Sequence, residues 1–398
     1  MGPIASLVAN DLWFWVNFII PIAIGLYMLI THSKYILQEF GIQVGVSFVV
    51  VTIAFVMAYT MSTDMYQVNY WNSKVSQFVY EEPWEEEYDC SYESCDSEGK
   101  NCVTIPKTCY TDHWPQYYLH TAIGETVSIS KENFRTASRE FGSKEEDVYR
   151  SGQTSSSKVK GEGDIWRSYP DEIIPTAVGH NQPNYVRLQM KNVIHDTFSK
   201  EELASPLLKP YPKITYNKYG GIHLNRVILS NAKVDSAYIK TMQKRLELMA
   251  VKYGSSKEVN PMVYLVDTED LTFKYLLDAY YEKAHKNDSI LVLSISEGKV
   301  VWSDVIAWTE NAGFLMNNTT VYTGLTDPNK IMDLYEKEIV NGWDRTEMKT
   351  KEYLARNIDL DWWVYLIVFL VNVGASAAVF YMSLDGQWLN RRKFRRYR

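Results

Sequence analysis

The sequence predicts a membrane-anchored α/β protein. It has three transmembrane helices and an extracytoplasmic ectodomain, which combines an α/β sandwich with a mixed sheet and a Cys-rich, disulfide-stapled loop region. Three observations predict this fold class. Three runs of about 20 residues carry no charged side chain. All four cysteines lie close together in the sequence, and apolar strand patterns alternate with helix patterns before the last apolar run.

The three uncharged runs cover residues 12–31, 42–61 and 362–384. A helix of about 20 residues crosses a hydrocarbon core of about 30 Å. Tryptophans such as Trp13 and Trp362 stand at the ends of the runs, where their rings prefer the headgroup zone. A very apolar buried helix is the alternative interpretation. No Lys or Arg precedes the first run, so it lacks the basic start of a signal peptide and we expect it to be retained.

The distribution of cations predicts the orientation of the chain. Residues 385–398 contain six Lys and Arg, and such clusters stay on the cytoplasmic side. Three spans then place the N-terminus and residues 62–361 outside the cytoplasm. Residues 62–361 hold 34 Lys and Arg against 45 Asp and Glu, a net charge of −11, which does not favour nucleic acid. We expect the basic tail to meet anionic lipids of the bilayer instead.

These patterns divide the chain into nine segments. They are a short extracytoplasmic N-terminus (1–11), the first span (12–31), a cytoplasmic loop (32–41), the second span (42–61), a Cys-rich, loop-rich part of the ectodomain (62–223), an α/β domain (224–345), a juxtamembrane segment (346–361), the third span (362–384) and a basic cytoplasmic tail (385–398).

The four cysteines follow the pattern C-x4-C-x6-C-x6-C, at Cys90, Cys95, Cys102 and Cys109. Four thiolates could hold zinc, but no CxxC pair is present to form the usual zinc knuckle. An extracytoplasmic location favours disulfides, which would stabilise a small loop-rich hairpin. We therefore expect two disulfides. Three pairings are open, because connectivity cannot be derived from spacing.

The segment before the last span alternates between strand and helix patterns. Its strand candidates are apolar throughout, which predicts a sheet covered on both faces. The helix candidates repeat apolar residues at steps of three and four. The expected strands are 224–229, 262–266, 290–295 and a hairpin partner at 299–308, and the expected helices are 235–253, 272–286 and 329–340.

The order of these elements resembles the TPM domain, a small α/β module that terminal spans often tether to membranes. The resemblance rests on LVDTED after one strand and on ILVLSISEGKVVW in the hairpin, and it covers residues 224–325. More loosely, CYTDHW, NYVRLQMKNV and WSDVIAWTENAGF resemble an uncharacterised group of phage-encoded membrane proteins with two N-terminal spans and one C-terminal span. This second resemblance implies a host bacterial inner membrane with the ectodomain in the periplasm, and it brings no established activity.

Four carboxylates are candidate metal ligands: Asp267, Glu269, Asp270 and Asp288. The first three follow a strand, and ligands gather at the carboxyl ends of strands in α/β sheets. Carboxylate oxygens suit Ca²⁺ or another divalent cation. The TPM resemblance also implies divalent-cation binding and a proposed phosphatase activity. The alternative is that Asp267 to Asp270 cap a helix, since acids there offset the helix dipole.

No catalytic nucleophile motif is present, and the seven His residues are scattered singly. We therefore favour a membrane-anchored accessory or interaction protein over a cation-dependent phosphatase or other hydrolase. Such a protein would have a protein partner or form a homo-oligomer through its spans or its ectodomain. Asn17, Gln43 and Asn372 are amides inside the spans, and amides in lipid bond to neighbouring helices, which indicates packing among spans or between subunits.

Overall fold

The computed structural model describes residues 8–9, 11–31, 37–62, 66–95, 102–148, 150, 163–184, 197–282, 284–351, 360 and 362–384. The basic tail at 385–398 lies outside the described residues, as does most of the juxtamembrane segment. The chain divides into two compact units. A helical unit comprises 1–67, 181–197 and 347–398, and a sheet unit comprises 68–180 and 198–346.

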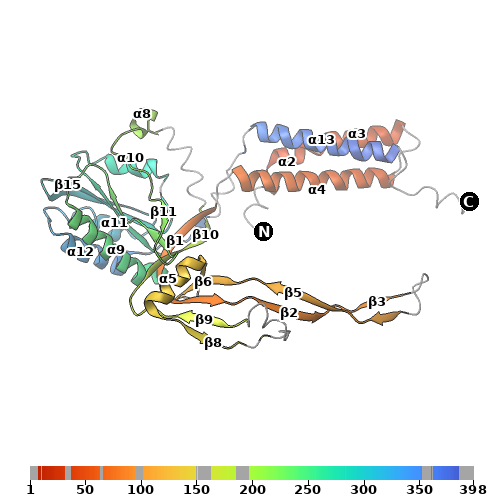
Figure 1. Ribbon diagram of the computed structural model, residues 1–398. Helices are drawn as coiled ribbons and strands as arrows, with labels where there is room; N and C mark the ends of the chain where they lie inside the picture. The colour runs from red at the N-terminus through yellow and green to blue at the C-terminus, as the bar shows by residue number, and fades with distance from the viewer. Residues whose placement is uncertain are drawn as a thin grey trace, which may run out of the picture. The chain divides into compact units, whose positions relative to one another are not determined.

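The described part of the helical unit is built from α2 (Leu12–Val16), α3 (Ile19–Thr31), α4 (Leu37–Ser62) and α13 (Trp362–Leu384). They lie side by side (Figure 1). Three stretches of the described residues are long and apolar enough to cross a membrane: Leu12–Thr31, Phe40–Thr60 and Trp362–Met382. The prediction of three apolar helices of spanning length is confirmed.

The first of these stretches is interrupted between α2 and α3 at residues 17–18. Pro21 explains the break, because proline has no N–H to donate to the carbonyl of Asn17 four residues earlier. Asn372 on α13 replaces the missing donor, with Nδ2 2.7 Å from that carbonyl oxygen. Ser47 on α4 donates in turn to Asn372 Oδ1 at 2.7 Å. The span amides Asn17 and Asn372 therefore hold the three helices of one chain together around a proline break.

Residues 66–224 form an eight-stranded sheet, where the sequence predicted a loop-rich region. Six strands follow one another in the order β11-β12-β10-β1-β6-β7, and β9 pairs with both β1 and β8. The pairings join distant segments, as between Phe78 and Leu119, so local patterns could not reveal them. The strands are β1 (Tyr66–Glu81), β6 (Gln116–Thr121), β7 (Thr126–Ser128), β8 (Lys144–Glu146), β9 (Ile165–Ser168), β10 (Pro175–Pro183), β11 (Ile214–Tyr216) and β12 (Ile222–Leu224).

A single helix, α5 (Lys131–Phe141), packs against this sheet. It begins with a capping box, in which Ser130 and Asn133 satisfy each other's backbone N–H groups. Its Phe134 and Ala137 join a buried cluster with Phe78 of β1 and Leu119 of β6.

The strands β1 and β6 continue into a two-stranded ribbon, which we call the stapled ribbon, residues 84–113. It consists of β2 (Trp84–Asp89) paired with β5 (Thr108–His113), followed by β3 (Tyr92–Ser94) paired with β4 (Val103–Ile105). Figure 1 shows it as a long hairpin. Cys90 pairs with Cys109 and Cys95 with Cys102, at S–S distances of 2.00 and 1.96 Å. The prediction of two disulfides is thus supported, and the pairing is nested.

The second sheet of the sheet unit is mixed, as the sequence predicts. Its order is β13-β14-β15-β16, and the first two pairs are parallel while the last is antiparallel. Glu297 and Gly298 have positive φ and form the tight turn between the last two strands. The strands are β13 (Val227–Leu229), β14 (Asn260–Val266), β15 (Asp288–Ser296) and β16 (Lys299–Ala307).

Helices cover both faces of this sheet, which makes it a sandwich. Alternate strand residues point to opposite faces. Val263 and Leu265 of β14 pack in a cluster with α9 (Ser236–Lys257), α11 (Ala312–Asn317) and α12 (Pro328–Gly342). Met262 and Tyr264 belong to the opposite cluster with α10 (Phe273–Tyr280). The short α8 (Lys200–Leu203) precedes this sheet in the chain.

The helix α9 extends four residues beyond the predicted end at Tyr253. The sequence analysis treated Gly254 as a break, but the helix continues to Lys257 and ends at Glu258, whose φ is 49°. Gly254 instead permits close packing. A Cβ on it would lie 2.7 Å from the carbonyl oxygen of Asn72 in β1. This glycine therefore lets the α/β sandwich approach the first sheet.

Candidate functional site

The structure separates the four predicted metal ligands. Because β14 and β15 are parallel and Asn260 pairs with Asp288, Asp288 lies where these strands begin. Asp267 follows the last residue of β14, at the opposite end of the sheet. Seven residue steps of about 3.3 Å, from Asn260 to Asp267, place the two aspartates roughly 23 Å apart along the sheet. Asp288 therefore cannot ligate the same ion as Asp267, Glu269 and Asp270.

The three remaining acids lie in the turn before α10. Asp270 Oδ1 accepts from the backbone N–H of Thr272 at 2.8 Å and from its hydroxyl at 2.6 Å. These two hydrogen bonds lower the pKa of Asp270. The backbone of Asp267 is held by both ends of the Asn231 amide. Among the described residues, no three His, Cys, Asp or Glu side chains lie close enough together to hold a metal ion. Asp270 thus caps the turn.

Asp288 belongs to a buried polar cluster between the two sheets. Its side chain is only 1% exposed. It accepts hydrogen bonds from the hydroxyl of Tyr211 at 2.9 Å, from Nδ2 of Asn260 at 2.7 Å and from the N–H of His285 at 2.8 Å. Burial and the carboxylate of Asp288 raise the pKa of Tyr211 well above its ordinary value. The carboxylate is therefore enclosed and saturated rather than available to a substrate.

Arg226, just before β13, is the cation of this cluster and is completely buried. Its guanidinium donates to Asn260 Oδ1, to the carbonyl of Pro261 at 3.1 Å and to Asn72 Oδ1 at 2.6 Å. Burial lowers the pKa of Arg226 to about 10. Asn260 joins the guanidinium to Asp288, so the two buried charges compensate each other through one amide.

The cluster links the first sheet to the sandwich. Asn72 lies on β1, and Asn287 donates to the carbonyl of Tyr70 on the same strand at 2.6 Å. Sequence analysis found Asp288 but not its role. One signal was present: Arg226 is the only charged residue of the strand candidate LNRVIL, in which four of the six residues are apolar. Such a residue needs buried partners.

The base of the stapled ribbon is fixed by ring stacking and charge. Trp84 stacks on His113, the residue opposite it in the ladder, with ring centroids 4.1 Å apart. His113 Nε2 is 2.8 Å from a carboxylate oxygen of Glu86. The guanidinium of Arg150 lies over the ring of Trp84, with its central carbon 5.2 Å from the ring centroid. Cation–π contact and stacking of this kind order the ribbon where it leaves the sheet.

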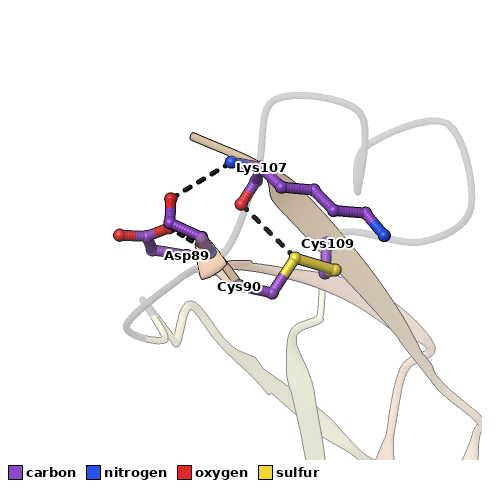
Figure 2. The surroundings of a disulfide bond; sticks show 5 residues. Asp89, Cys90, Lys107 and Cys109 are labelled. Atoms are coloured by element: carbon purple, nitrogen blue, oxygen red, sulfur yellow. Dashed lines mark hydrogen bonds between the residues drawn. A yellow bond between two sulfur atoms is a disulfide. The ribbon is translucent and has the colours of Figure 1, made fainter. Parts of the chain in front are cut away.

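The Cys90–Cys109 disulfide, the one nearer the base of the ribbon, is surrounded by local hydrogen bonds (Figure 2). The N–H of Cys90 donates to the carbonyl of Lys107 at 2.9 Å, which continues the ladder past β2. The N–H of Lys107 donates to the hydroxyl of Ser91 at 3.1 Å. The hydroxyl and the N–H of Ser91 both donate to Asp89, and these two hydrogen bonds lower the pKa of Asp89. The ribbon thus stays paired across residues 90–91 and 106–107 without a core beneath it.

The stapled ribbon presents large apolar and aromatic side chains to solvent on both of its strand pairs. Tyr92 is 52% exposed and Val103 is 65% exposed. Tyr88, Ile105 and Tyr110 are exposed as well. The whole ribbon carries eight acids against two lysines, a net charge of −6. Exposed aromatic side chains on a rigid, charged element are typical of protein-binding surfaces rather than of catalytic sites.

Comparisons with protein families, with curated proteins and with solved structures found no match to this chain. The resemblances to the TPM domain and to phage-encoded membrane proteins therefore stay predictions. Two features of the structure bear on function: the apolar helices of spanning length and the stapled ribbon.

Proposed function

We propose that the chain is an integral membrane protein that anchors an extracytoplasmic binding domain, and that this domain holds a protein partner through the stapled ribbon. The role is that of an accessory or interaction protein. The partner presents a basic surface with apolar recesses, complementary to the acidic, tyrosine-bearing ribbon. A TPM-like identity of residues 224–345 and a place in the bacterial inner membrane belong to the same proposal.

Two observations support the membrane part. Three apolar helices have spanning length, and their outer faces expose large apolar side chains such as Ile30 and Leu370. Exposing such an apolar surface is unfavourable in water and favourable in the hydrocarbon of a bilayer. Both cysteine pairs are at disulfide distance, and disulfides persist in oxidising compartments. The disulfides support the extracytoplasmic location that we propose for residues 62–361.

The stapled ribbon is the single observation that carries the binding role. An isolated two-stranded ribbon is at best marginally stable in water. Here two nested disulfides stabilise it, while Tyr92 and Val103 stay exposed. Covalent stabilisation of a segment that buries little surface makes sense when the exposed side chains have a task.

The membrane part is tested by fusing a periplasmic reporter enzyme after Arg398 or within residues 62–361, and by alkaline extraction of membranes. We expect the internal fusion to be active, the C-terminal fusion to be inactive and the protein to stay in the membrane pellet. An active reporter after Arg398 would show that the proposed orientation is wrong.

The binding role is tested with a photo-crosslinking amino acid in the intact protein in cells. Placed at Tyr92 or Val103, it should yield one major adduct with a second protein. Placed at Val340, an exposed position on α12, it should yield none. The adduct should also disappear in the double variant C90S/C109S. Equal labelling at all three positions would contradict a ribbon-specific partner.

No feature of the described residues favours the alternative, a cation-dependent hydrolase. Asp288 is enclosed by hydrogen bonds, and Asp270 caps the turn before α10. Turnover of phosphate monoesters that is lost in Asp267→Asn, with the fold intact, would overturn our preference for a binding protein.

A further inference from the structure

A pocket of about 470 Å³ opens on the helical unit between α2 and α13. It is lined mainly by apolar surface, and its volume is in the range of small-molecule sites. Its residues all belong to the helical unit and lie near the start of the first and third apolar stretches. They are Trp13, Val16, Asn17, Leu360, Trp362, Tyr365, Leu366 and Phe369.

The mouth of the pocket is aromatic and adjoins a carboxylate. Trp13 is 52% and Trp362 is 76% exposed, and the rings of Trp13 and Tyr365 are 5.8 Å apart. The hydroxyl of Tyr365 lies 3.1 Å from Oδ2 of Asp11, which also accepts from the hydroxyl of Tyr59 at 2.6 Å. Aromatic rings beside a carboxylate are the chemistry that recognises an ammonium group.

The lining also includes Val16, Leu366 and Phe369, which offer no polar group to a ligand. Such side chains suit an acyl chain. A docked helix from another chain is a poorer fit, because close helix packing in lipid uses Gly, Ala and Ser. The lining contains none of these.

We propose that this pocket binds one aminophospholipid of the outer leaflet, with its primary ammonium at Trp13, Trp362 and Tyr365 and an acyl chain along Leu366 and Phe369. A primary ammonium donates a hydrogen bond to the half-exposed carboxylate of Asp11, whose Oδ1 also accepts from the N–H of Trp13 at 2.8 Å, whereas a choline group has no N–H to donate. The charge of Asp11 disfavours lipids with a net negative headgroup. The site rests on the membrane insertion proposed above.

The test uses the full-length protein in nanodiscs made of equal parts phosphatidylethanolamine, phosphatidylcholine and phosphatidylglycerol. Native mass spectrometry counts the lipids retained on the ejected protein. We expect phosphatidylethanolamine to be retained about fivefold over phosphatidylcholine, the size of one net hydrogen bond that choline cannot donate. Asp11→Asn should reduce this preference most, and Trp362→Leu should lower the retention of both zwitterionic lipids, because it removes a cation–π contact that either head group can make. Trp363→Leu, which changes an adjacent tryptophan outside the pocket, should leave both the preference and the retention unchanged.

Equal retention of the three lipids by the wild type would overturn the lipid site. The same holds if W363L lowers the retention of the zwitterionic lipids as fully as W362L, or if phosphatidylglycerol is preferred. Melting temperature and gel-filtration profile verify that each variant is folded. Alkaline extraction separates the two proposals. A chain released from membranes refutes both insertion and the site, whereas an inserted chain without lipid preference refutes only the site.

Discussion

Arg226 shows at the scale of one residue how the sheet unit is held together. Replacing it with Met keeps much of its volume but leaves Asp288 charged and buried, and leaves Asn72 and Asn260 without their donor. Removing one partner of a buried charge pair costs about 3–5 kcal/mol. We expect Arg226→Met to lower the unfolding free energy by that amount in urea titrations of the detergent-solubilised protein.

The matched control for this prediction is Arg135→Met. Arg135 pairs with Glu132 on the exposed side of α5. Surface pairs of this kind contribute about 0–1 kcal/mol. If both variants lose the same stability, the buried cluster does not link the two sheets.

Lys286 provides a residue-scale prediction about pH. It is 4% exposed, and burial lowers its pKa to about 8. The unfolded chain keeps the ordinary pKa of about 10.4, so between these values it binds more protons than the folded chain. Stability should therefore rise with pH across this window. From pH 7 to 9.5 the wild type should gain about 2 kcal/mol relative to Lys286→Met. Parallel pH profiles of the two proteins would contradict the burial of a titrating lysine.

At the scale of elements, the packing of α9 predicts whether Gly254→Ala raises or lowers the free energy of unfolding. Gly→Ala within a helix normally stabilises by about 1 kcal/mol. At Gly254 the new Cβ would lie 2.7 Å from the carbonyl oxygen and 2.8 Å from the nitrogen of Asn72, both backbone atoms. We expect Gly254→Ala to destabilise by about 1–3 kcal/mol, the usual cost of overpacking. Thermal unfolding measures it, with Ser255→Ala on the same helix as the control; a more stable G254A protein would refute the close approach.

The same helix shows what the sequence could predict about elements. The apolar stripe with Met242, Leu246 and Met249 located α9, because its period reflects burial against one sheet. The predicted end was wrong because a glycine can either end a helix or allow another backbone to approach closely. Only the position of β1, whose Asn72 lies against Gly254, shows that the second applies here. The eight-stranded sheet was missed for a related reason. Buried polar residues such as Asn69 and Asn72 interrupt the apolar pattern of β1, and its partners are far away in the sequence.

The candidate site was predictable in part, again for physical reasons. Cysteine count and location predicted two disulfides, but the nested pairing depends on the register of the ribbon. The carboxylates were grouped by their nearness in sequence to strand ends. In a parallel pair, the first residue of one strand and the residue after its neighbour lie at opposite ends of the strands, which separates Asp288 from Asp267.

At the scale of the whole molecule, the division into two units predicts that residues 66–346 fold without the spans. The three buried clusters of this part draw their members from 75–174, 208–219 and 227–343 and use none of the apolar helices. The fragment contains all four cysteines. Secreted into an oxidising compartment, it should be soluble, carry no free thiol and unfold in one cooperative transition near that of the full-length sheet unit.

The same fragment with Cys90→Ser and Cys109→Ser should keep this transition and lose only protection of the ribbon from proteolysis, because the ribbon contributes little to the buried clusters. A fragment that aggregates, or that melts well below the intact protein, would mean that the helical unit is needed to fold the sheets.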